Sequence, residues 1–282
     1  MWKEITLSGF ADEIDEKLSE QIRVLRKLGM SYLEMRGVNG KGLVEYSIEE
    51  VKEIKKQLDA EGIKLSSVGS PIGKIKITDT FEPHMELYKH TVEIAHKMET
   101  DYIRMFSFFM PENADCSQYK EEVMERLGKM VDYAKANDII LLHENEKDIY
   151  GDVASRCLEI QKAFYCDHFK AVFDFANFVQ CKQNTLKAYE MMKPYVAYIH
   201  IKDALWSDAS VVPPGTGDGN MEEILGKFKA GGYQGFLSLE PHLSDFGGFS
   251  ALEQNASQKE KLDVEEAFTL AHDSLLKILD RL

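Results

Sequence analysis

The sequence predicts an α/β protein in which residues 1–282 form a single (β/α)8 barrel. Short apolar runs alternate with amphipathic helical stretches along the whole chain. Several of these runs are continuously apolar, which is typical of parallel strands buried on both faces. The chain contains no low-complexity segment and no linker rich in Pro, Gly or Ser. A barrel of this length commonly forms one domain, so we expect a single domain.

Eight apolar runs are predicted as the barrel strands because they are short and rich in β-branched or aromatic residues. They cover residues 4–10, 31–37, 64–70, 101–109, 139–146, 170–178, 196–204 and 235–241. The predicted helices have apolar residues three and four positions apart. The clearest of them cover residues 47–62, 83–98, 118–137, 220–232 and 264–282. Ser47 and Glu50 form a capping box at the start of the first of these helices.

An open doubly wound sheet is the alternative α/β fold. That fold usually carries a glycine-rich nucleotide turn, GxGxxG, after its first strand. The stretch after the first predicted strand, LSGFADEID at residues 7–15, has no such turn. The sequence therefore favours the barrel.

Composition narrows the class of protein. The chain carries 34 basic and 48 acidic side chains, a net charge of −14, which opposes binding to nucleic acid phosphates. We find no apolar run long enough to span a membrane and no signal-like apolar segment at the N-terminus. The four cysteines lack CxxC spacing and are expected to be reduced thiols. We expect a cytoplasmic protein that binds neither nucleic acid nor membranes.

The last four predicted strands end in residues that bind metals. Glu144, Asp174, His200 and Glu240 stand at corresponding positions at these strand ends. Adjacent strands lie about 4.8 Å apart, so the four side chains are expected to converge at the carboxyl edge of the barrel. Buried together without a cation, three carboxylates would repel one another. This set of ligands predicts one divalent cation, Mn²⁺ first, with Mg²⁺, Co²⁺ or Zn²⁺ as alternatives.

Five motifs connect the chain to a known group of proteins: LLHENE, FDFANF, IHIKDA, GTGDGNMEEIL and FLSLEP. With these motifs the chain resembles the xylose-isomerase-like TIM barrel superfamily of sugar isomerases, epimerases and inosose dehydratases. The resemblance covers essentially the whole chain. It implies that Glu144, Asp174, His200 and Glu240 are the metal ligands. It also implies that Glu144 and Glu240 are the catalytic carboxylates that move protons.

Such a site predicts a divalent-metal-dependent sugar isomerase or epimerase. A cation that chelates a carbonyl and a neighbouring hydroxyl acidifies the adjacent C–H and stabilises a metal-bound enediolate. Glu144 and Glu240 then serve as base and acid on opposite sides of the substrate. Loss of a β-hydroxyl from the same enediolate would dehydrate the substrate instead. The alternative function is therefore a lyase that dehydrates an inosose or a 3-keto-sugar.

The expected substrate shell departs from that of the ketose epimerases. Asn177 stands where those relatives usually have a histidine, and Tyr150 and Trp206 replace a glutamate and an arginine. These departures keep the lyase open as the alternative. The predicted substrate-binding residues lie near the strand ends: Lys202, Asn177, Asp203, Arg104 and Trp206. For Lys202, a salt bridge with Asp203 at the rim is an equally good explanation.

Glu34 and Arg36 lie near the end of the second predicted strand and either bind substrate hydroxyls or form rim salt bridges. Residues 241–262 form a long connection that we expect to act as a lid, with Gly247 and Gly248 as a hinge.

Two other functions are weighed against these. An apurinic endonuclease is disfavoured by the net charge of −14 and by the missing histidine after Asp174. A barrel that only binds sugar would hold a metal without exchanging any substrate proton. The expected ligand is a small sugar or cyclitol, and the resemblance implies a homodimer or homotetramer.

Overall fold

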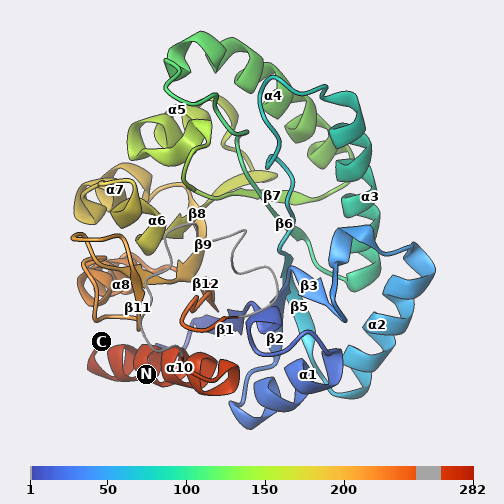
Figure 1. Ribbon diagram of the computed structural model, residues 1–282, viewed down its shortest axis with the longest axis vertical. Coiled ribbons are helices and arrows are strands. Elements are labelled where there is room, and N and C mark those ends of the chain that lie inside the picture. Colours follow the sequence, from blue (N-terminus) through green and yellow to red (C-terminus); the bar gives the residue numbers. More distant parts are fainter. Residues whose placement is uncertain (1, 246–261) are drawn as a thin grey trace.

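The computed structural model describes residues 2–245 and 262–282 and confirms the predicted barrel (Figure 1). Eight parallel strands form one sheet in the order β1-β12-β9-β8-β7-β6-β5-β2. A parallel bridge between Phe10 and Glu34 links the ends of the first and last strands of that order. The strands are β1 Ile5–Gly9, β2 Tyr32–Met35, β5 Lys64–Val68, β6 Tyr102–Met105, β7 Ile140–His143, β8 Phe169–Asp174, β9 Val196–Ile201 and β12 Gly235–Leu239.

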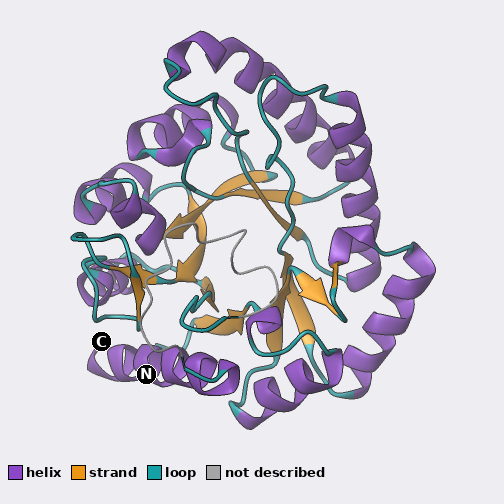
Figure 2. Ribbon diagram, viewed as in Figure 1, coloured by secondary structure: helices purple, strands orange, loops and turns teal. Residues whose placement is uncertain are grey.

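Helices surround the strands on the outside of the barrel (Figure 2). They are α1 Leu18–Lys27, α2 Ile48–Ala60, α3 Glu82–Met98, α4 Lys120–Ala136, α5 Ala154–Phe164, α6 Phe175–Gln180, α7 Thr185–Met192, α8 Met221–Ala230 and α10 Val264–Arg281. The predicted capping box is present, because Ser47 N donates to Glu50 Oε2 at 2.8 Å and Glu50 N donates to Ser47 Oγ at 3.4 Å. It satisfies backbone groups that the first turn of α2 would otherwise leave without partners.

The prediction of a strand over residues 170–178 was wrong beyond Asp174. Residues 175–178 belong to α6, and the carboxylate of Asp174 caps this helix by accepting a hydrogen bond from Asn177 N at 2.7 Å. The predicted strand over 196–204 likewise ends at Ile201. Asp203–Ala204 forms β10 instead, which pairs with β11, Val211–Val212. After β8 the backbone turns into α6, whose first turn is capped by the Asp174 side chain. After β9 the backbone pairs with β11 instead of with a barrel strand.

A second hairpin pairs β3, Gly37–Val38, with β4, Lys41–Gly42. Most of the predicted lid, residues 246–261, lies outside the described residues.

Polar groups also occupy the interior of the barrel. Ser66 Oγ lies 2.6 Å from Ser8 Oγ and 2.8 Å from Tyr198 OH, and all three side chains are buried. These hydroxyls satisfy one another, which removes most of the cost of burying them. The Tyr198 ring also packs against the rings of Tyr102 and Phe236, with centroids 6.2 and 5.5 Å away.

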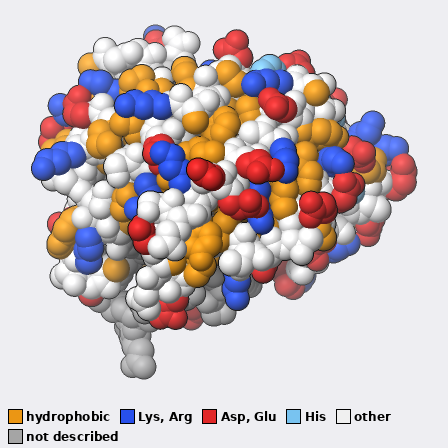
Figure 3. Space-filling model, turned by 90° about the horizontal axis from the view of Figure 1, so that it is seen from above, with side chains coloured by type: hydrophobic (Ala, Val, Ile, Leu, Met, Phe, Trp, Pro, Cys, Tyr) orange, Lys and Arg blue, Asp and Glu red, His pale blue; other side chains and the backbone are white. Residues whose placement is uncertain are grey.

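The surface is charged and mixed. Lys and Arg side chains are interspersed with Asp and Glu on the face shown in Figure 3. Within the part of the chain that the structure describes, no helix combines the length and apolar character that a membrane crossing requires.

Candidate metal centre

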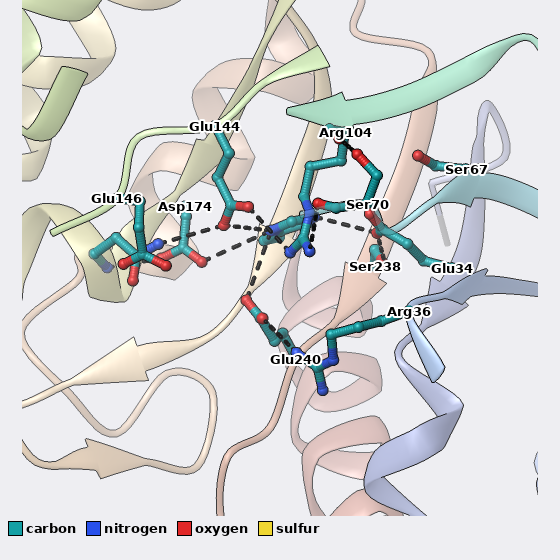
Figure 4. Close-up of polar contacts among 12 residues, drawn as sticks. Glu34, Arg36, Ser67, Ser70, Arg104, Glu144, Glu146, Asp174, Ser238 and Glu240 are labelled. Carbon is teal, nitrogen blue, oxygen red and sulfur yellow. Dashed lines mark hydrogen bonds and ion pairs between the residues drawn. The ribbon is translucent and has the colours of Figure 1, made fainter. Parts of the chain in front are cut away.

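The barrel brings together the four side chains that follow its last strands. Glu144 comes directly after β7, Asp174 ends β8, His200 lies in β9 and Glu240 comes directly after β12. All four are buried, and one potential ligand atom from each lies within 4.8 Å of the others. Figure 4 shows Glu144, Asp174 and Glu240 pointing toward a common centre. Parallel strands end at one edge of the barrel, which is why residues so far apart in the chain meet here.

His200 has its two ring nitrogens on different sides of this cluster. Nδ1 lies 2.9 Å from Glu144 Oε1, 3.7 Å from Glu240 Oε2 and 3.9 Å from Asp174 Oδ2. Nε2 lies 3.2 Å from Glu34 Oε2. The Nδ1 atom therefore belongs to the cluster of four side chains, and the Nε2 atom faces a different carboxylate.

Lys202 is part of the same cluster. Its Nζ lies 2.9 Å from Glu240 Oε2 and 3.2 Å from Asp174 Oδ2, and the side chain is buried. A salt bridge with Asp203 at the rim was the other interpretation of this lysine, and these contacts replace it. The ammonium offsets part of the negative charge that the three carboxylates place inside the barrel.

Arg104 and Asn177 both contact Glu144. Arg104 Nη1 lies 3.2 Å from Glu144 Oε2, and Asn177 Nδ2 donates to Glu144 Oε1 at 3.3 Å. The guanidinium of Arg104 lies over the rings of Phe10 and Phe106, at 5.0 and 4.8 Å from their centroids. Donors on both oxygens hold the Glu144 carboxylate in a defined orientation.

The orientation of Glu240 is fixed in a similar way. Arg36 Nη1 lies 3.3 Å from Glu240 Oε1, whereas Lys202 Nζ contacts the other oxygen, Oε2. Arg36 also bonds to Asp12, with Nε donating to Oδ2 at 2.8 Å. Its guanidinium lies 4.7 Å from the centroid of the Phe10 ring.

Glu13 and His242 lie next to Glu240 and were missed by the sequence analysis as site residues. His242 Nε2 is 3.4 Å from Glu13 Oε1 and 3.5 Å from Glu240 Oε1. These three residues form a second group of potential ligands, and Arg36 also contacts Glu13 at 3.4 Å. The available signals were the position of Glu13 after the first strand and that of His242 two residues after Glu240.

The structure does not bring Asp203 or Trp206 into the cluster. The Asp203 carboxylate accepts hydrogen bonds from the backbone N–H groups of Ala204, Gly215, Gly217 and Gly219 at 2.9 to 3.0 Å. A Cβ at Gly217 or Gly219 would lie only 2.5 or 2.6 Å from Asp203 Oδ1, so glycine is required for this approach. Trp206 is 44% exposed and donates its backbone N–H to Asp218.

The pKa values of the three carboxyl groups in the cluster are shifted in different directions. Burial raises the pKa of Asp174 to about 7 against the opposing charge of Lys202. Burial also opposes ionisation of Glu144, but the charges of His200 and Arg104 outweigh it and lower its pKa. Burial acts against ionisation of Glu240 too, yet its pKa is lowered well below the ordinary range by Lys202 and further positive neighbours. Asp174 is thus the carboxylate whose charge the described residues compensate least.

The side chains present fit a divalent cation. Asp174 Oδ1 caps α6, whereas Oδ2 is buried and accepts no hydrogen bond within the described ranges 2–245 and 262–282, although the Lys202 ammonium lies 3.2 Å from it. Three carboxylates and one imidazole are ligands that Mn²⁺, Mg²⁺, Co²⁺ and Zn²⁺ accept. A cation at this position would be coordinated by Asp174 Oδ2 and would compensate the negative charge of that carboxylate.

Solved structures of other proteins share this barrel architecture. No curated protein sequence matches the chain. Among solved structures, the IOLI protein with a binding zinc atom superposes with a TM-score of 0.75 at 16% identity over 98% of both chains. D-psicose 3-epimerase in the presence of D-fructose gives a TM-score of 0.75 at 17% identity, over 96% of this chain and 97% of that chain.

The probable 3-DHS dehydratase AsbF of Bacillus anthracis gives a TM-score of 0.73 at 15% identity, over 96% of this chain and 98% of that chain. At these identities the structural matches establish a shared fold. The sequence profile of one family, described as xylose isomerase-like TIM barrel, matches residues 22–266, which is most of the chain. The protein therefore belongs to the xylose isomerase-like TIM barrel family.

Proposed function

We propose that this protein is a divalent-metal-dependent isomerase or epimerase of a sugar or cyclitol. The observation that carries the proposal is the convergence of Glu144, Asp174, His200 and Glu240, whose potential ligand atoms lie within 4.8 Å of one another. The buried Oδ2 of Asp174, which accepts no hydrogen bond within the described part of the chain, supports it. Structural neighbours that are a 3-epimerase and a zinc-binding protein support it further.

The proposed chemistry divides between the cation and the protein. The bound cation would polarise a substrate carbonyl and make the neighbouring C–H more acidic. Glu144 and Glu240 reach the site from strands β7 and β12, and both are held ionised. In the proposal one carboxylate removes the proton from the substrate carbon, and the other, after binding a proton from solvent, delivers that proton to the opposite face.

The neighbouring side chains would hold the two proton-transferring carboxylates in fixed orientations. Arg104 and Asn177 orient Glu144, while Arg36 and Lys202 orient Glu240. Fixed carboxylates reduce the reorganisation needed in the transition state. We propose that Lys202 and Arg104 also donate hydrogen bonds to substrate oxygens, and that Asp203 and Trp206 shape the neighbouring loop. Asn177 donates its amide N–H groups to Glu144 Oε1 and Asn145 O, and its Oδ1 has no hydrogen-bond partner among the described residues, so we propose that this oxygen accepts from a substrate hydroxyl.

A hydro-lyase acting on an inosose or a 3-keto-sugar is the second candidate. The observation that favours it is the buried ammonium of Lys202, 2.9 Å from Glu240 Oε2. A proton donor next to the base is what the departure of a β-hydroxyl as water requires. The structural neighbour described as a 3-DHS dehydratase supports this alternative.

One experiment separates the candidates. The Mn²⁺-loaded protein is incubated in D₂O with D-fructose, D-psicose, D-tagatose and an inosose, and the products are analysed by NMR and mass spectrometry. Deuterium on carbon without loss of water supports the isomerase or epimerase, and loss of water supports the lyase. Mn²⁺ binding without exchange on any substrate of this panel would leave a sugar-binding barrel. Glu240→Gln is the control, because it removes a carboxylate that is proposed both to bind the cation and to transfer a proton.

The remaining parts of the proposal are a cytoplasmic location, a small-molecule partner in place of nucleic acid or membranes, and a homodimer or homotetramer. The net charge of −14 supports the exclusion of nucleic acid. Light scattering of the purified protein tests the oligomeric state. Tight binding to an abasic DNA duplex at physiological salt would contradict the small-molecule partner.

A further inference from the structure

The two nitrogens of His200 have different surroundings, and this difference bears on how a cation would be held. Nδ1 faces Glu144, Asp174 and Glu240. Nε2 faces only Glu34 among the carboxylates within 4 Å that the structure describes, at 3.2 Å. Glu34 is outside the group of four whose ligand atoms lie within 4.8 Å of one another. It therefore contacts a proposed ligand without belonging to the proposed ligand set.

Glu34 is built into the barrel wall at the place where the barrel closes. It lies in β2, fully buried, at a shift in the register between β2 and β5. Its Oε2 accepts a hydrogen bond from Ser238 Oγ at 2.8 Å. Ser238 is the residue of β12 that stands directly opposite His200 of β9 in the sheet. The same oxygen of Glu34 thus contacts the Ser238 hydroxyl and the Nε2 atom of His200, which stand on neighbouring strands. Figure 4 shows Glu34 next to Ser238.

We propose that Glu34 is a positioning residue that holds the imidazole of His200 with Nδ1 presented to the cation. The inference rests on the metal centre of the proposed function. A neutral imidazole carries one N–H and one lone pair. When Nε2–H donates to the Glu34 carboxylate, the lone pair resides on Nδ1, which is the nitrogen inside the cluster.

The placement of Glu34 also explains why a carboxylate is buried on the side of His200 that faces away from the cluster. A buried carboxylate without partners is costly, and the Oε2 atom of this one contacts the imidazole and the Ser238 hydroxyl, while its buried Oε1 has no hydrogen-bond partner among the described residues. The contact fixes the ring orientation as well as the position of the proton. A carboxylate that contacts a metal-binding histidine in this way typically changes metal affinity by about 10- to 100-fold.

The first test compares Mn²⁺ binding by isothermal titration in the wild type, Glu34→Gln and Glu146→Gln. Glu146 is a matched control, because it is a partly buried carboxylate near the site that pairs with Lys74 at 3.1 Å, outside the group of four. We expect Glu34→Gln to weaken Mn²⁺ binding by about 10- to 100-fold and Glu146→Gln by less than about threefold. Equal losses in both variants would show a general charge effect and overturn the inference.

The second test uses the wild type and is independent of whether Glu34→Gln folds. The Zn²⁺-loaded protein with ¹⁵N-labelled histidine is studied by long-range ¹H–¹⁵N NMR, and His200 is assigned among the 8 histidines by its absence in His200→Asn. We expect a protonated Nε2 and a metal-bound Nδ1. The reverse arrangement would overturn the inference.

The two levels of the proposal fail in different ways. A wild type that binds neither Mn²⁺ nor Zn²⁺ would remove the metal centre and the role of Glu34 together. A wild type that binds metal, with Glu34→Gln binding as tightly, would leave the metal centre intact and remove only the role of Glu34.

Discussion

Lys202 Nζ lies 2.9 Å from Glu240 Oε2 inside the barrel, and the lysine side chain is only 2% exposed. The same ammonium is 3.2 Å from Asp174 Oδ2, so it contacts two oxygens that face the proposed cation. A cation and this ammonium would therefore compete for the same carboxylates. We therefore expect Lys202 to affect both the affinity for a metal ion and the stability of the metal-free protein.

Lys202→Met is expected to strengthen Mn²⁺ binding by about tenfold, since about 1.4 kcal/mol of competition from the ammonium is removed. It is also expected to destabilise the metal-free protein by about 3 kcal/mol, because two buried carboxylates lose their counter-ion. Titration calorimetry and urea denaturation measure the two effects. Lys74→Met, which removes a lysine that pairs with Glu146 instead, is the control. Weaker Mn²⁺ binding in Lys202→Met would contradict the competition.

Asp174→Asn separates the two uses of the Asp174 side chain. Asparagine retains an oxygen that caps α6, as Asp174 Oδ1 does for Asn177 N at 2.7 Å, but it loses the charge directed at the cluster. We expect Mn²⁺ affinity to fall by roughly 100-fold, about 3 kcal/mol, with the helical circular dichroism unchanged. Asp174→Ala loses the cap as well and is expected to lose about 1 kcal/mol of capping stabilisation that Asp174→Asn retains. Unchanged Mn²⁺ affinity in Asp174→Asn would remove Asp174 from the proposed ligand set.

Asp203→Asn is expected to act on the loop at residues 213–220 and not on metal binding. The carboxylate accepts four backbone hydrogen bonds, and an amide in its place cannot accept those on its nitrogen side. We expect the free energy of unfolding to fall by about 2–3 kcal/mol, with Mn²⁺ affinity changed less than about threefold. Asp218→Asn, at an exposed residue of the same loop, serves as the control for denaturation. A large loss of Mn²⁺ affinity in Asp203→Asn would instead support direct involvement of Asp203 in the site.

His84, in α3, makes stability depend on pH away from the metal centre. Burial, with a contribution from the charge of Arg126, lowers the pKa of His84 from 6.5 to about 4, and its Nε2 accepts a hydrogen bond from Gly73 N at 2.7 Å. Between pH 6.5 and about 4 the unfolded histidine binds a proton that the folded one does not. This contribution to stability is therefore complete above pH 6.5 and is lost as the pH falls toward 4, by up to about 3 kcal/mol.

His84→Gln keeps an acceptor for Gly73 N and cannot titrate. We expect its free energy of unfolding to fall less steeply than that of the wild type between pH 6.5 and 4, as measured by urea denaturation at several pH values. Parallel curves for the two proteins across this window would contradict the assignment. Other buried acids titrate in both proteins, so the difference between the curves is the informative quantity.

The sequence by itself determined the barrel and the positions along it of the four side chains predicted to bind a metal ion. Continuous apolar runs separated by amphipathic helices are sufficient for parallel strands, and such strands all end at one edge. Glu144, Asp174, His200 and Glu240 could be placed at that edge because each stands at the end of its own run. Their role as metal ligands stays a prediction, whereas their proximity is a property of the structure.

Only the tertiary structure decided which further side chains contact the four. Glu34 and His200 are 166 residues apart in the chain and meet because the barrel closes with a particular stagger between its strands. Two further contacts likewise depend on how the loops fold over the strand ends. Lys202 is buried against Glu240, and the Asp203 carboxylate accepts hydrogen bonds from three glycine N–H groups. Periodicity in sequence reports which face a residue occupies, but the partner across a barrel is set by closure and register, which no local pattern encodes.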